Sequence, residues 1–196
     1  MPSYELLEVA DHEIKVTNPE KVFFPELGLT KLDLVLYYLS VAEGVLTGAR
    51  DRPTLLKRHP GGVHGDFFYQ KRVPSPRPEW IKTATVHFPS GRSATFLVVH
   101  DEAHIAWAIN LGCIDLNPWP VRMDDVDHPD ELRVDVDPTP GVPWDHVRRV
   151  SLIVRDALTE HGLVGYPKTS GKRGMHIYAR IERNWEFRQV RRAALA

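Results

Sequence analysis

Two carboxylates, a basic glycine-rich loop and a histidine lie within residues 132–178. Asp135 and Asp137 alternate with Val134 and Val136. In a strand, side chains two residues apart project from the same face, so the valines can enter a core while both aspartates face outward. Such a pair repels unless a cation joins it, and Mg²⁺ or Mn²⁺ prefers carboxylate oxygens. The pattern predicts a phosphoryl-transfer site, although a half-exposed strand that happens to be acidic would read the same way.

The loop from Lys168 to Gly174 supplies groups that suit an anion. Ser170 offers a hydroxyl, Lys172 and Arg173 offer positive charge, and the two glycines let backbone N–H groups approach phosphate oxygens. The Walker A spacing is absent, and the loop leads into a strand at residues 175–181 rather than into a helix. A solvated turn can have the same composition, so the loop indicates a triphosphate cradle only in combination with the aspartates.

The elements around these groups are expected to bring them together. His176 opens its strand on the same face as Tyr178. A helix is predicted from Trp144 to His161, with Gly162 as its C′ residue, and its apolar stripe consists of Val147, Val150, Val154, Ala157 and Leu158. Parallel strands joined by such a helix place their C-terminal ends at one edge of a sheet, so the aspartate pair and the Ser170 loop should meet there.

Several motifs in order carry a family resemblance. VDVDP, KTSGKRGMH and the upstream IDLNPWP resemble the motifs of the polymerase domain of bacterial DNA ligase D, a primase-polymerase of the archaeo-eukaryotic primase superfamily. The family typically reads D-L-D-P and then K-T-S-G-x-K-G-x-H. The resemblance implies an α+β fold, a mixed two-module primase-like arrangement with the D-x-D strand in its central sheet. It also implies an incomplete primase-polymerase domain over residues 1–196, with a 5′-phosphate region in 1–50 and a catalytic region in 51–196.

The resemblance assigns roles at the predicted catalytic centre. Asp135 and Asp137 would hold Mn²⁺ or Mg²⁺ and act in catalysis together with His176, which would contact phosphate or sugar. The nucleotide-binding residues would be Asn117, Ser170, Lys172, Arg173 and His176. The family usually has histidine where Asn117 stands. Since asparagine can hydrogen-bond a phosphate but cannot become a cation, this departure predicts lower activity.

A second site is expected near the N-terminus. Thr30 is a good N-cap for a helix that should run to Gly48, with an apolar stripe formed by Val35, Tyr38, Leu39, Ala42, Val45 and Leu46. Lys31 then falls in the first turn, where the helix dipole disfavours a cation while exposed N–H groups favour an anion. A bound phosphate would explain it, and so would a solvated surface lysine. By resemblance, Asn18, Lys21 and Lys31 match the family pocket for the 5′-phosphate of a recessed DNA end.

Two strands are expected at Arg52–Arg58 and Phe67–Lys71. Lys57 and Arg58 should point to opposite faces unless a kink or strand end frees both, and both are expected to contact DNA. The run Phe67-Phe68-Tyr69 cannot face one core, so at least one ring is left to stack on a partner such as a base. The resemblance implies that Phe68 and Tyr69 pack against template and downstream DNA; the alternative is that they fill two faces of a buried sheet.

Composition limits the class of protein. The 196 residues have 42% hydrophobic content, a net charge of −1 and one cysteine, Cys113, which fits a reducing cytoplasm. No apolar run of membrane-spanning length and no signal-peptide pattern is present, so no membrane partner is expected. A hairpin is predicted at 85–88 and 94–99 around Pro89-Ser90-Gly91, and a helix at Glu102–Leu111 that ends at Gly112.

The last segment, Glu186 to Ala196, is helix-forming sequence without an exit signal, so we expect the chain to stop inside an element. The family's third metal-binding aspartate would lie beyond it. Three hypotheses follow: a primase-polymerase at DNA ends in non-homologous end joining, a non-catalytic DNA-end-binding module, or another metal-dependent phosphoryl enzyme such as a nuclease or phosphatase. The resemblance implies as partners 5′-phosphorylated DNA ends, NTP or dNTP with a ribonucleotide preference, a DNA ligase and a Ku-type protein, in the bacterial cytoplasm and at the nucleoid when DNA is bound.

Overall fold

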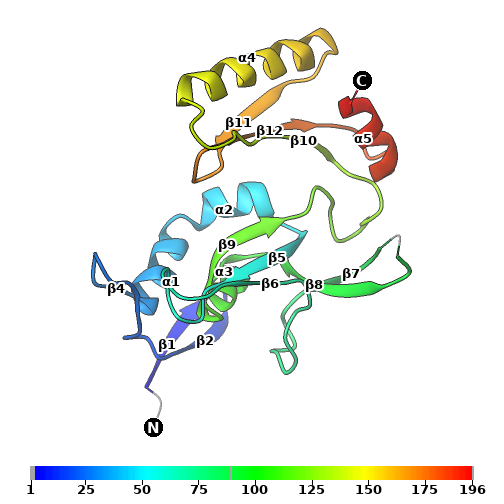
Figure 1. The fold of residues 1–196 in the computed structure, drawn as a ribbon. Coiled ribbons are helices and arrows are strands. Elements are labelled where there is room, and N and C mark those ends of the chain that lie inside the picture. The colour runs from blue at the N-terminus through cyan, green and yellow to red at the C-terminus, as the bar shows by residue number, and fades with distance from the viewer. Residues whose placement is uncertain (1–2, 89, 196) are drawn as a thin grey trace. The chain divides into compact units, whose positions relative to one another are not determined.

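The computed structural model describes residues 3–88 and 90–195, and the chain divides into two compact units, Met1–Trp119 and Pro120–Ala196. Helices and strands are mixed in both (Figure 1), which confirms the expected α+β class. The residues expected to form the 5′-phosphate region, 1–50, share the first unit with residues 51–119. The expected division at residue 50 separates a DNA-end-binding role from a catalytic role, and it stays a prediction.

The first unit is built on a five-stranded antiparallel sheet and two small hairpins. β5 is central in the sheet and pairs with β6, β8 and β9, while β7 pairs with β8. The strands of the unit are β1 (Tyr4–Val9), β2 (His12–Thr17), β3 (Val22–Phe24), β4 (Leu29–Thr30), β5 (Arg52–Arg58), β6 (Phe68–Gln70), β7 (Thr83–His87), β8 (Ser93–Val99) and β9 (Cys113–Pro118). The strands expected at 52–58, 67–71, 85–88 and 94–99 are thereby confirmed within a few residues; Pro89, in the predicted turn, lies outside the described residues.

The expected helix to Gly48 is two helices. α1 (Lys31–Ser40) and α2 (Ala42–Ala49) meet at Val41 with a bend of 73°. Thr30 caps α1 as predicted, in a capping box with Asp33. The Ser40 hydroxyl donates to the carbonyl of Tyr37 at 2.7 Å, a local bond that competes with continuation of the helix. Val35, Ala42 and Leu46 of the predicted stripe are buried nonetheless.

α3 (Glu102–Asn110) is the central helix of the first unit's core. Every residue from Ala103 to Ile109 is buried, as is typical of a helix that is apolar all round. Gly112 follows with φ +80°, so the predicted helix end is confirmed. α1, α2 and β2 pack against α3, which fixes the position of its C-terminal carbonyls relative to the start of α1.

The second unit is a three-stranded sheet with one long helix on it. β10 (Glu131–Val136) and β11 (Gly165–Thr169) both run antiparallel to β12 (Met175–Arg180), which lies between them. The expected parallel direction of β10 and β11 is therefore correct, but they are not neighbours, because the hairpin at the Ser170 loop inserts β12 between them. The C-terminal ends of β10 and β11 still lie at one edge, beside the start of β12.

α4 (Trp144–Glu160) covers one face of this sheet, and α5 (Phe187–Leu195) follows β12 (Figure 1). The predicted stripe of α4 is wrong at Val150 and Ala157, which are exposed; Val147, Ser151 and Leu158 are buried. The buried positions lie four and eleven residues after Val147, and Ser151 is accommodated there because its hydroxyl donates to the Val147 carbonyl at 2.8 Å. Gly162 has φ +72°, as its C′ position requires.

Among the described residues, no single helix combines the length and apolar character that crossing a membrane needs, and only α1 and α2 taken together reach them by length and composition.

A buried histidine links α3 to the sheet of the first unit. The side chain of His104 is 2% exposed, its Nδ1 lies 2.7 Å from Oδ1 of Asp101, and its Nε2 accepts the backbone N–H of Lys82 at 3.1 Å. Since Nε2 accepts, the neutral ring carries its proton on Nδ1 and donates it to Asp101. Burial lowers the pKa of His104, and the Asp101 carboxylate offsets this only in part.

This lowered pKa predicts a loss of stability at mildly acidic pH. As pH falls below about 6.5, the ordinary histidine value, unfolded His104 takes up a proton while folded His104 does not, so the free energy of unfolding falls until pH reaches the lowered folded pKa. Chemical unfolding between pH 7.5 and 5 should show a shallower decline for His104→Gln than for the unchanged chain. The matched control is His87→Gln on the exposed side of β7, and an equal change of slope in both variants would contradict the assignment to His104.

Candidate phosphate pocket and carboxylate site

Three cations meet in one pocket of the first unit. The pocket has a volume of about 240 Å³ and includes Lys21, Lys31 and Arg58 among its lining residues, which are Thr17, Asn18, Lys21, Phe23, Lys31, Arg58, Pro60, Asn110, Leu111 and Gly112. These lining residues include no carboxylate, so nothing in that set neutralises the cations. The structure thus brings together Asn18, Lys21 and Lys31, which the sequence analysis grouped.

Lys31 is buried, with 6% of its surface exposed. Its Nζ donates to Oγ1 of Thr17 at 3.2 Å and to the carbonyl of Asn110, the last residue of α3, at 3.1 Å. A cation is favoured at the carbonyl end of a helix. Desolvation, followed by the charges of Lys21 and Arg58, lowers the pKa of Lys31 to about 8. The alternative of a solvated surface lysine is therefore wrong.

The start of α1 does not offer the free N–H groups that the sequence suggested. The N–H of Lys31 donates to the Lys21 carbonyl at 2.8 Å, and the N–H of Leu32 donates to the Pro19 carbonyl at 3.0 Å. Asp33 N–H is taken by the Thr30 cap. These bonds fold the 18–21 turn against the helix, so the capacity of the pocket for an anion comes from side chains rather than from the helix terminus.

Arg58 reaches this pocket because β5 is irregular at its end. The pairing of β5 with β9 shifts register between Lys57 and Arg58. Arg58 donates through Nε to the Leu111 carbonyl at 2.7 Å and through a terminal nitrogen to Gln70 at 2.7 Å. Lys57 instead pairs with Asp115 at 3.0 Å, so the two residues have different partners at an irregular strand end, the exception that the prediction of opposite faces allowed.

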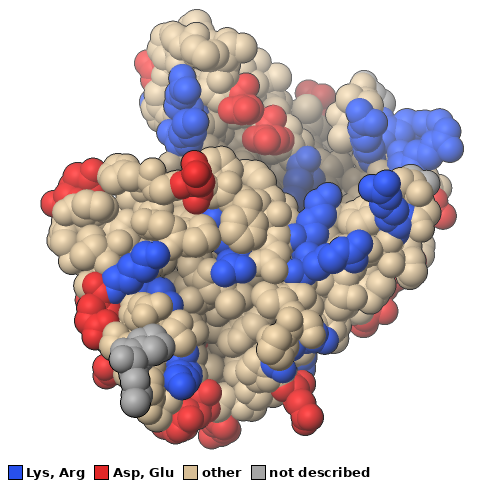
Figure 2. Space-filling model, turned by 60° about the horizontal axis from the view of Figure 1, so that its bottom comes forward, with Lys and Arg blue, Asp and Glu red and all other residues tan. Residues whose placement is uncertain are grey.

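The aromatic run at β6 is exposed. Phe67, Phe68 and Tyr69 are 52%, 45% and 57% exposed, so the alternative that they fill a buried sheet is wrong. The Lys57 ammonium lies 4.6 Å from the Phe67 ring centroid, and the Arg58 guanidinium lies 5.3 Å from that of Phe68. Exposed rings with adjacent cations suit stacked bases between phosphates. Figure 2 shows lysine and arginine side chains on the face in view, together with aspartate and glutamate side chains.

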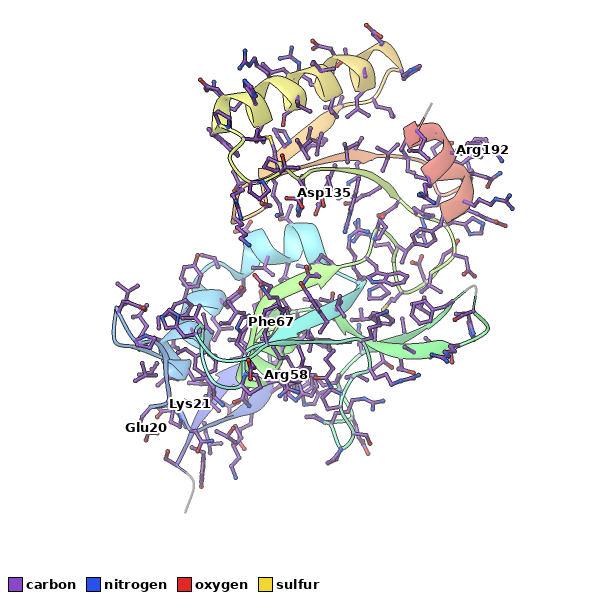
Figure 3. The ribbon with its side chains drawn as sticks, viewed as in Figure 1. Glu20, Lys21, Arg58, Phe67, Asp135 and Arg192 are labelled. Atoms are coloured by element: carbon purple, nitrogen blue, oxygen red, sulfur yellow. The ribbon has the colours of Figure 1, made fainter. Side chains whose placement is uncertain are left out.

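The carboxylate site lies in the second unit. Asp135 and Asp137 are both exposed, as alternation in the strand predicts, and Figure 3 shows Asp135 on the side of the sheet away from α4. Asp135 pairs in register with His176, and its Oδ1 lies 3.6 Å from Nε2 of that ring. Burial and Lys168 lower the pKa of His176, while Asp135 and Asp137 oppose that shift, so both carboxylates act electrostatically on the same ring.

The Ser170 loop closes on the end of β10. A Cβ added at Gly174 would lie 2.5 Å from the Val136 carbonyl oxygen and 3.5 Å from Cα of Asp137, so only glycine permits this approach. The Gly174 N–H donates to Oγ of Ser170 at 3.0 Å, and the Ser170 N–H donates to the Gly174 carbonyl at 2.9 Å. Because the serine oxygen accepts inside the loop, its own proton is left to donate outward. Lys172 and Arg173 are exposed on the loop.

The donor set suits a hard divalent ion that keeps other ligands from water or substrate. Among residues 3–88 and 90–195, no group of three or more His, Cys, Asp or Glu side chains is placed to hold a metal. Asp135 and Asp137 supply two carboxylates at one strand end, and Mg²⁺ is commonly held in proteins by one or two carboxylates plus substrate phosphates. The residues therefore fit an ion that arrives with a nucleotide.

The nucleotide-binding role of Asn117 stays a prediction, and Thr17, Asn110 and Tyr178 take part in these sites without a predicted role. Asn117 lies exposed on β9 in the first unit, where its amide donates to the Asp115 carbonyl at 3.2 Å. Thr17 and Asn110, which hold Lys31, were not predicted, because their roles come from packing of α3 against β2 rather than from any local motif. Tyr178, expected on the same face of its strand as His176, contacts that ring, although no role was predicted for it.

Comparison with known proteins identifies the family of the chain. The chain matches the family described as LigD, primase-polymerase domain, over residues 30–196. It is 31% identical over 167 residues to the multifunctional non-homologous end joining protein LigD of Mycolicibacterium smegmatis, covering 84% of this chain and 22% of that protein. It is also 31% identical over 189 residues to the LigD of Mycobacterium tuberculosis, covering 88% and 24%.

A solved structure gives the same result. The polymerase domain from Mycobacterium tuberculosis ligase D in complex with DNA matches with a TM-score of 0.74 and 32% identity, over 86% of this chain and 61% of that one. The chain thus spans about a quarter of the length of the curated relatives and rather more of the solved domain. Because the family match covers residues 30–196, well over half of the chain, the chain belongs to the LigD primase-polymerase domain family.

Proposed function

We propose that the chain acts at DNA ends as a primase-polymerase-type nucleotidyltransferase in non-homologous end joining, in the bacterial cytoplasm and at the nucleoid when DNA is bound. The observation that carries this proposal is the meeting of Asp135, His176 and the Ser170 loop at one end of the β10–β12 sheet. Carboxylates, a histidine N–H and a loop hydroxyl with cations are the groups that nucleotidyl transfer needs on a triphosphate.

Each residue has a distinct task in this proposal. Asp135 and Asp137 would hold Mn²⁺ or Mg²⁺, which neutralises developing phosphate charge and activates the attacking oxygen. Ser170, Lys172 and Arg173 would bind the triphosphate oxygens, and His176 would donate to one of them. The primer 3′-hydroxyl would attack the α-phosphate and pyrophosphate would leave, with NTP or dNTP as substrate. A DNA ligase would then join the filled end, and a Ku-type protein would hold it.

The pocket at Lys21, Lys31 and Arg58 favours DNA-end binding as a function in its own right. A terminal phosphate monoester carries nearly two negative charges at neutral pH, and three cations without a lining carboxylate match that charge better than a singly charged internal phosphodiester. The 5′-phosphate of a recessed DNA end therefore suits the pocket. A chain that binds such ends but does not add nucleotides would be a non-catalytic end-binding module.

Nucleotide addition should depend on both carboxylates. Asp135→Asn and Asp137→Asn each remove one anionic ligand, so extension of a labelled primer with Mn²⁺ should fall by about a thousandfold or more, since a catalytic metal contributes several kcal/mol. Asp145→Asn, on the exposed side of α4, is the matched control and should leave the rate unchanged. Absence of extension by the unchanged chain would contradict the polymerase assignment, and loss of label from the primer end would indicate a nuclease instead.

End recognition should depend on the pocket lysines. Lys21→Ala combined with Lys31→Met, which keeps the buried stem of Lys31, should remove the preference for a 5′-phosphorylated recessed end over a 5′-hydroxyl end. Charge-assisted hydrogen bonds contribute about 1.5–3 kcal/mol each, enough for at least tenfold discrimination. Lys15→Ala, outside the pocket, is the control for general loss of positive charge. If the unchanged chain bound both ends equally, the pocket would not be a 5′-phosphate site.

The same preference should vary with pH. Without a bound phosphate the pKa of Lys31 is about 8, and a bound phosphate would raise that pKa. The affinity for the phosphorylated end should therefore be highest below pH 8, where Lys31 is charged, and should fall as pH rises above that value. Below pH ~6 the phosphate takes up its second proton, and the preference should fall again. Equilibrium binding from pH 5.5 to 9.5 measures both limbs. The upper limb should be absent in Lys31→Met; a decline of the same size in that variant would assign it to another group.

A further inference from the structure

His176 has two different neighbours at its two ring nitrogens. Nδ1 lies 3.2 Å from the hydroxyl oxygen of Tyr178, and Nε2 lies 3.6 Å from Oδ1 of Asp135. The rings of His176 and Tyr178 are nearly parallel, with an interplanar angle of 23° and centroids 6.0 Å apart. The two side chains project from the same face of β12, two residues apart, so the contact follows from the strand itself.

These neighbours favour one tautomer of a neutral imidazole. An ionised carboxylate can only accept a hydrogen bond, so a proton on Nε2 is attracted toward Asp135, whereas a lone pair there would be repelled. Nδ1 must then accept, and the Tyr178 hydroxyl can donate to it. In the other tautomer the tyrosine oxygen could accept, but Nε2 would turn its lone pair to the carboxylate. The Asp135 contact therefore selects Nε2–H, and the Tyr178 hydroxyl stabilises that tautomer by donating to Nδ1.

The tyrosine ring also contacts a cation on the neighbouring strand. The guanidinium of Arg133 lies 4.5 Å from the Tyr178 ring centroid, and Arg133 is fixed by two bonds to Oε2 of Glu131, at 3.0 and 2.7 Å. Glu131 is 5% exposed and also pairs with Arg180 at 3.0 Å. The order Asp135, His176, Tyr178, Arg133, Glu131 thus runs along one sheet face, from the exposed carboxylate to a buried ion pair.

We infer that Tyr178 is a positioning residue, whose hydroxyl orients His176 so that the Nε2–H points to the Asp135 side and donates to a phosphate oxygen of the nucleotide. The inference deepens the proposed function and rests on it for the identity of the anion. Tyr178 does not touch the nucleotide in this account. Its effect passes through the histidine, which distinguishes it from a tyrosine that merely packs.

The matched control is on the neighbouring strand. Tyr166 of β11 pairs in register with Tyr178 and presents its side chain on the same face, where it is 61% exposed. Lys168, not Tyr166, is the β11 residue paired with His176. Tyr178→Phe removes one hydroxyl and keeps the ring beneath Arg133. Tyr166→Phe makes the same chemical change on the same face, away from Nδ1.

The first test is the tautomer itself and needs no ligand. Long-range ¹H–¹⁵N correlation spectra of the metal-free chain, with the His176 signals assigned by their loss in His176→Gln, should show Nε2 protonated and Nδ1 as acceptor. Tyr178→Phe should shift His176 toward a mixture of tautomers, and Tyr166→Phe should not. An unchanged His176 spectrum in Tyr178→Phe, or an Nδ1-protonated ring in the unchanged chain, would overturn the inference whatever the nucleotide experiments show.

The second test asks whether the effect passes through His176. Tyr178→Phe should weaken Mg²⁺-nucleotide affinity by about threefold to tenfold, the range for one hydrogen bond. Glutamine at 176 donates from an amide placed near Nε2 and has no tautomer, so Tyr178→Phe added to His176→Gln should cause no further loss. Equal losses in both backgrounds would show a structural role and overturn the inference. An unchanged chain with the expected tautomer but no nucleotide affinity would instead contradict the proposed function.

Discussion

The close approach of Gly174 to the end of β10 is the contact on which the carboxylate site depends. With the Val136 carbonyl 2.5 Å from where a Cβ would stand, the loop and the strand lie backbone to backbone and no side chain can separate them. Ser170 closes the loop on itself through its own oxygen. As a result, a hydroxyl and two cations are held beside two carboxylates by bonds that use backbone N–H groups of the loop but not the Ser170 hydroxyl proton, so an anion would be bound by side chains. A substitution at Gly174 would shift the loop without removing any of those groups.

The first unit prepares its anion site in a different way. Its carboxylate-free pocket places a lysine inside the protein and holds it with neutral oxygens, those of Thr17 and of the last carbonyl of α3. Burial, followed by the charges of Lys21 and Arg58, lowers the pKa of Lys31 to about 8, and the neutral acceptors do not supply the countercharge that a carboxylate would. An anion that enters supplies the missing countercharge. The capacity for phosphate is therefore built from desolvation as much as from the number of cations.

Local chemistry made much of this predictable from sequence. Alternation gave the exposed aspartates and the shared face of His176 and Tyr178, and capping signals gave the start of α1 and the ends of α3 and α4. The predictions that failed concern features that depend on contacts distant in the sequence, or on side-chain hydrogen bonds that compete with regular structure. The break at Val41 depends on a serine bond to a carbonyl, and Ser151 replaces Val150 on the buried face of α4. The insertion of β12 between β10 and β11 depends on pairing, which helical and strand periodicity do not encode.

The two sites also show why net charge was a poor guide to nucleic-acid chemistry here. The net charge of −1 arises from 25 basic and 26 acidic residues, but the fold places residues of the two signs in different environments. Acidic side chains such as Asp130 and Glu131 are buried and paired with arginines, so they contribute little field outside the second unit. The pocket of the first unit has cations and no lining carboxylate. A phosphate that approaches either site therefore interacts with the charged side chains near that site rather than with the net charge of the chain. At physiological salt the Debye length is about 8 Å, so charges farther away are largely screened.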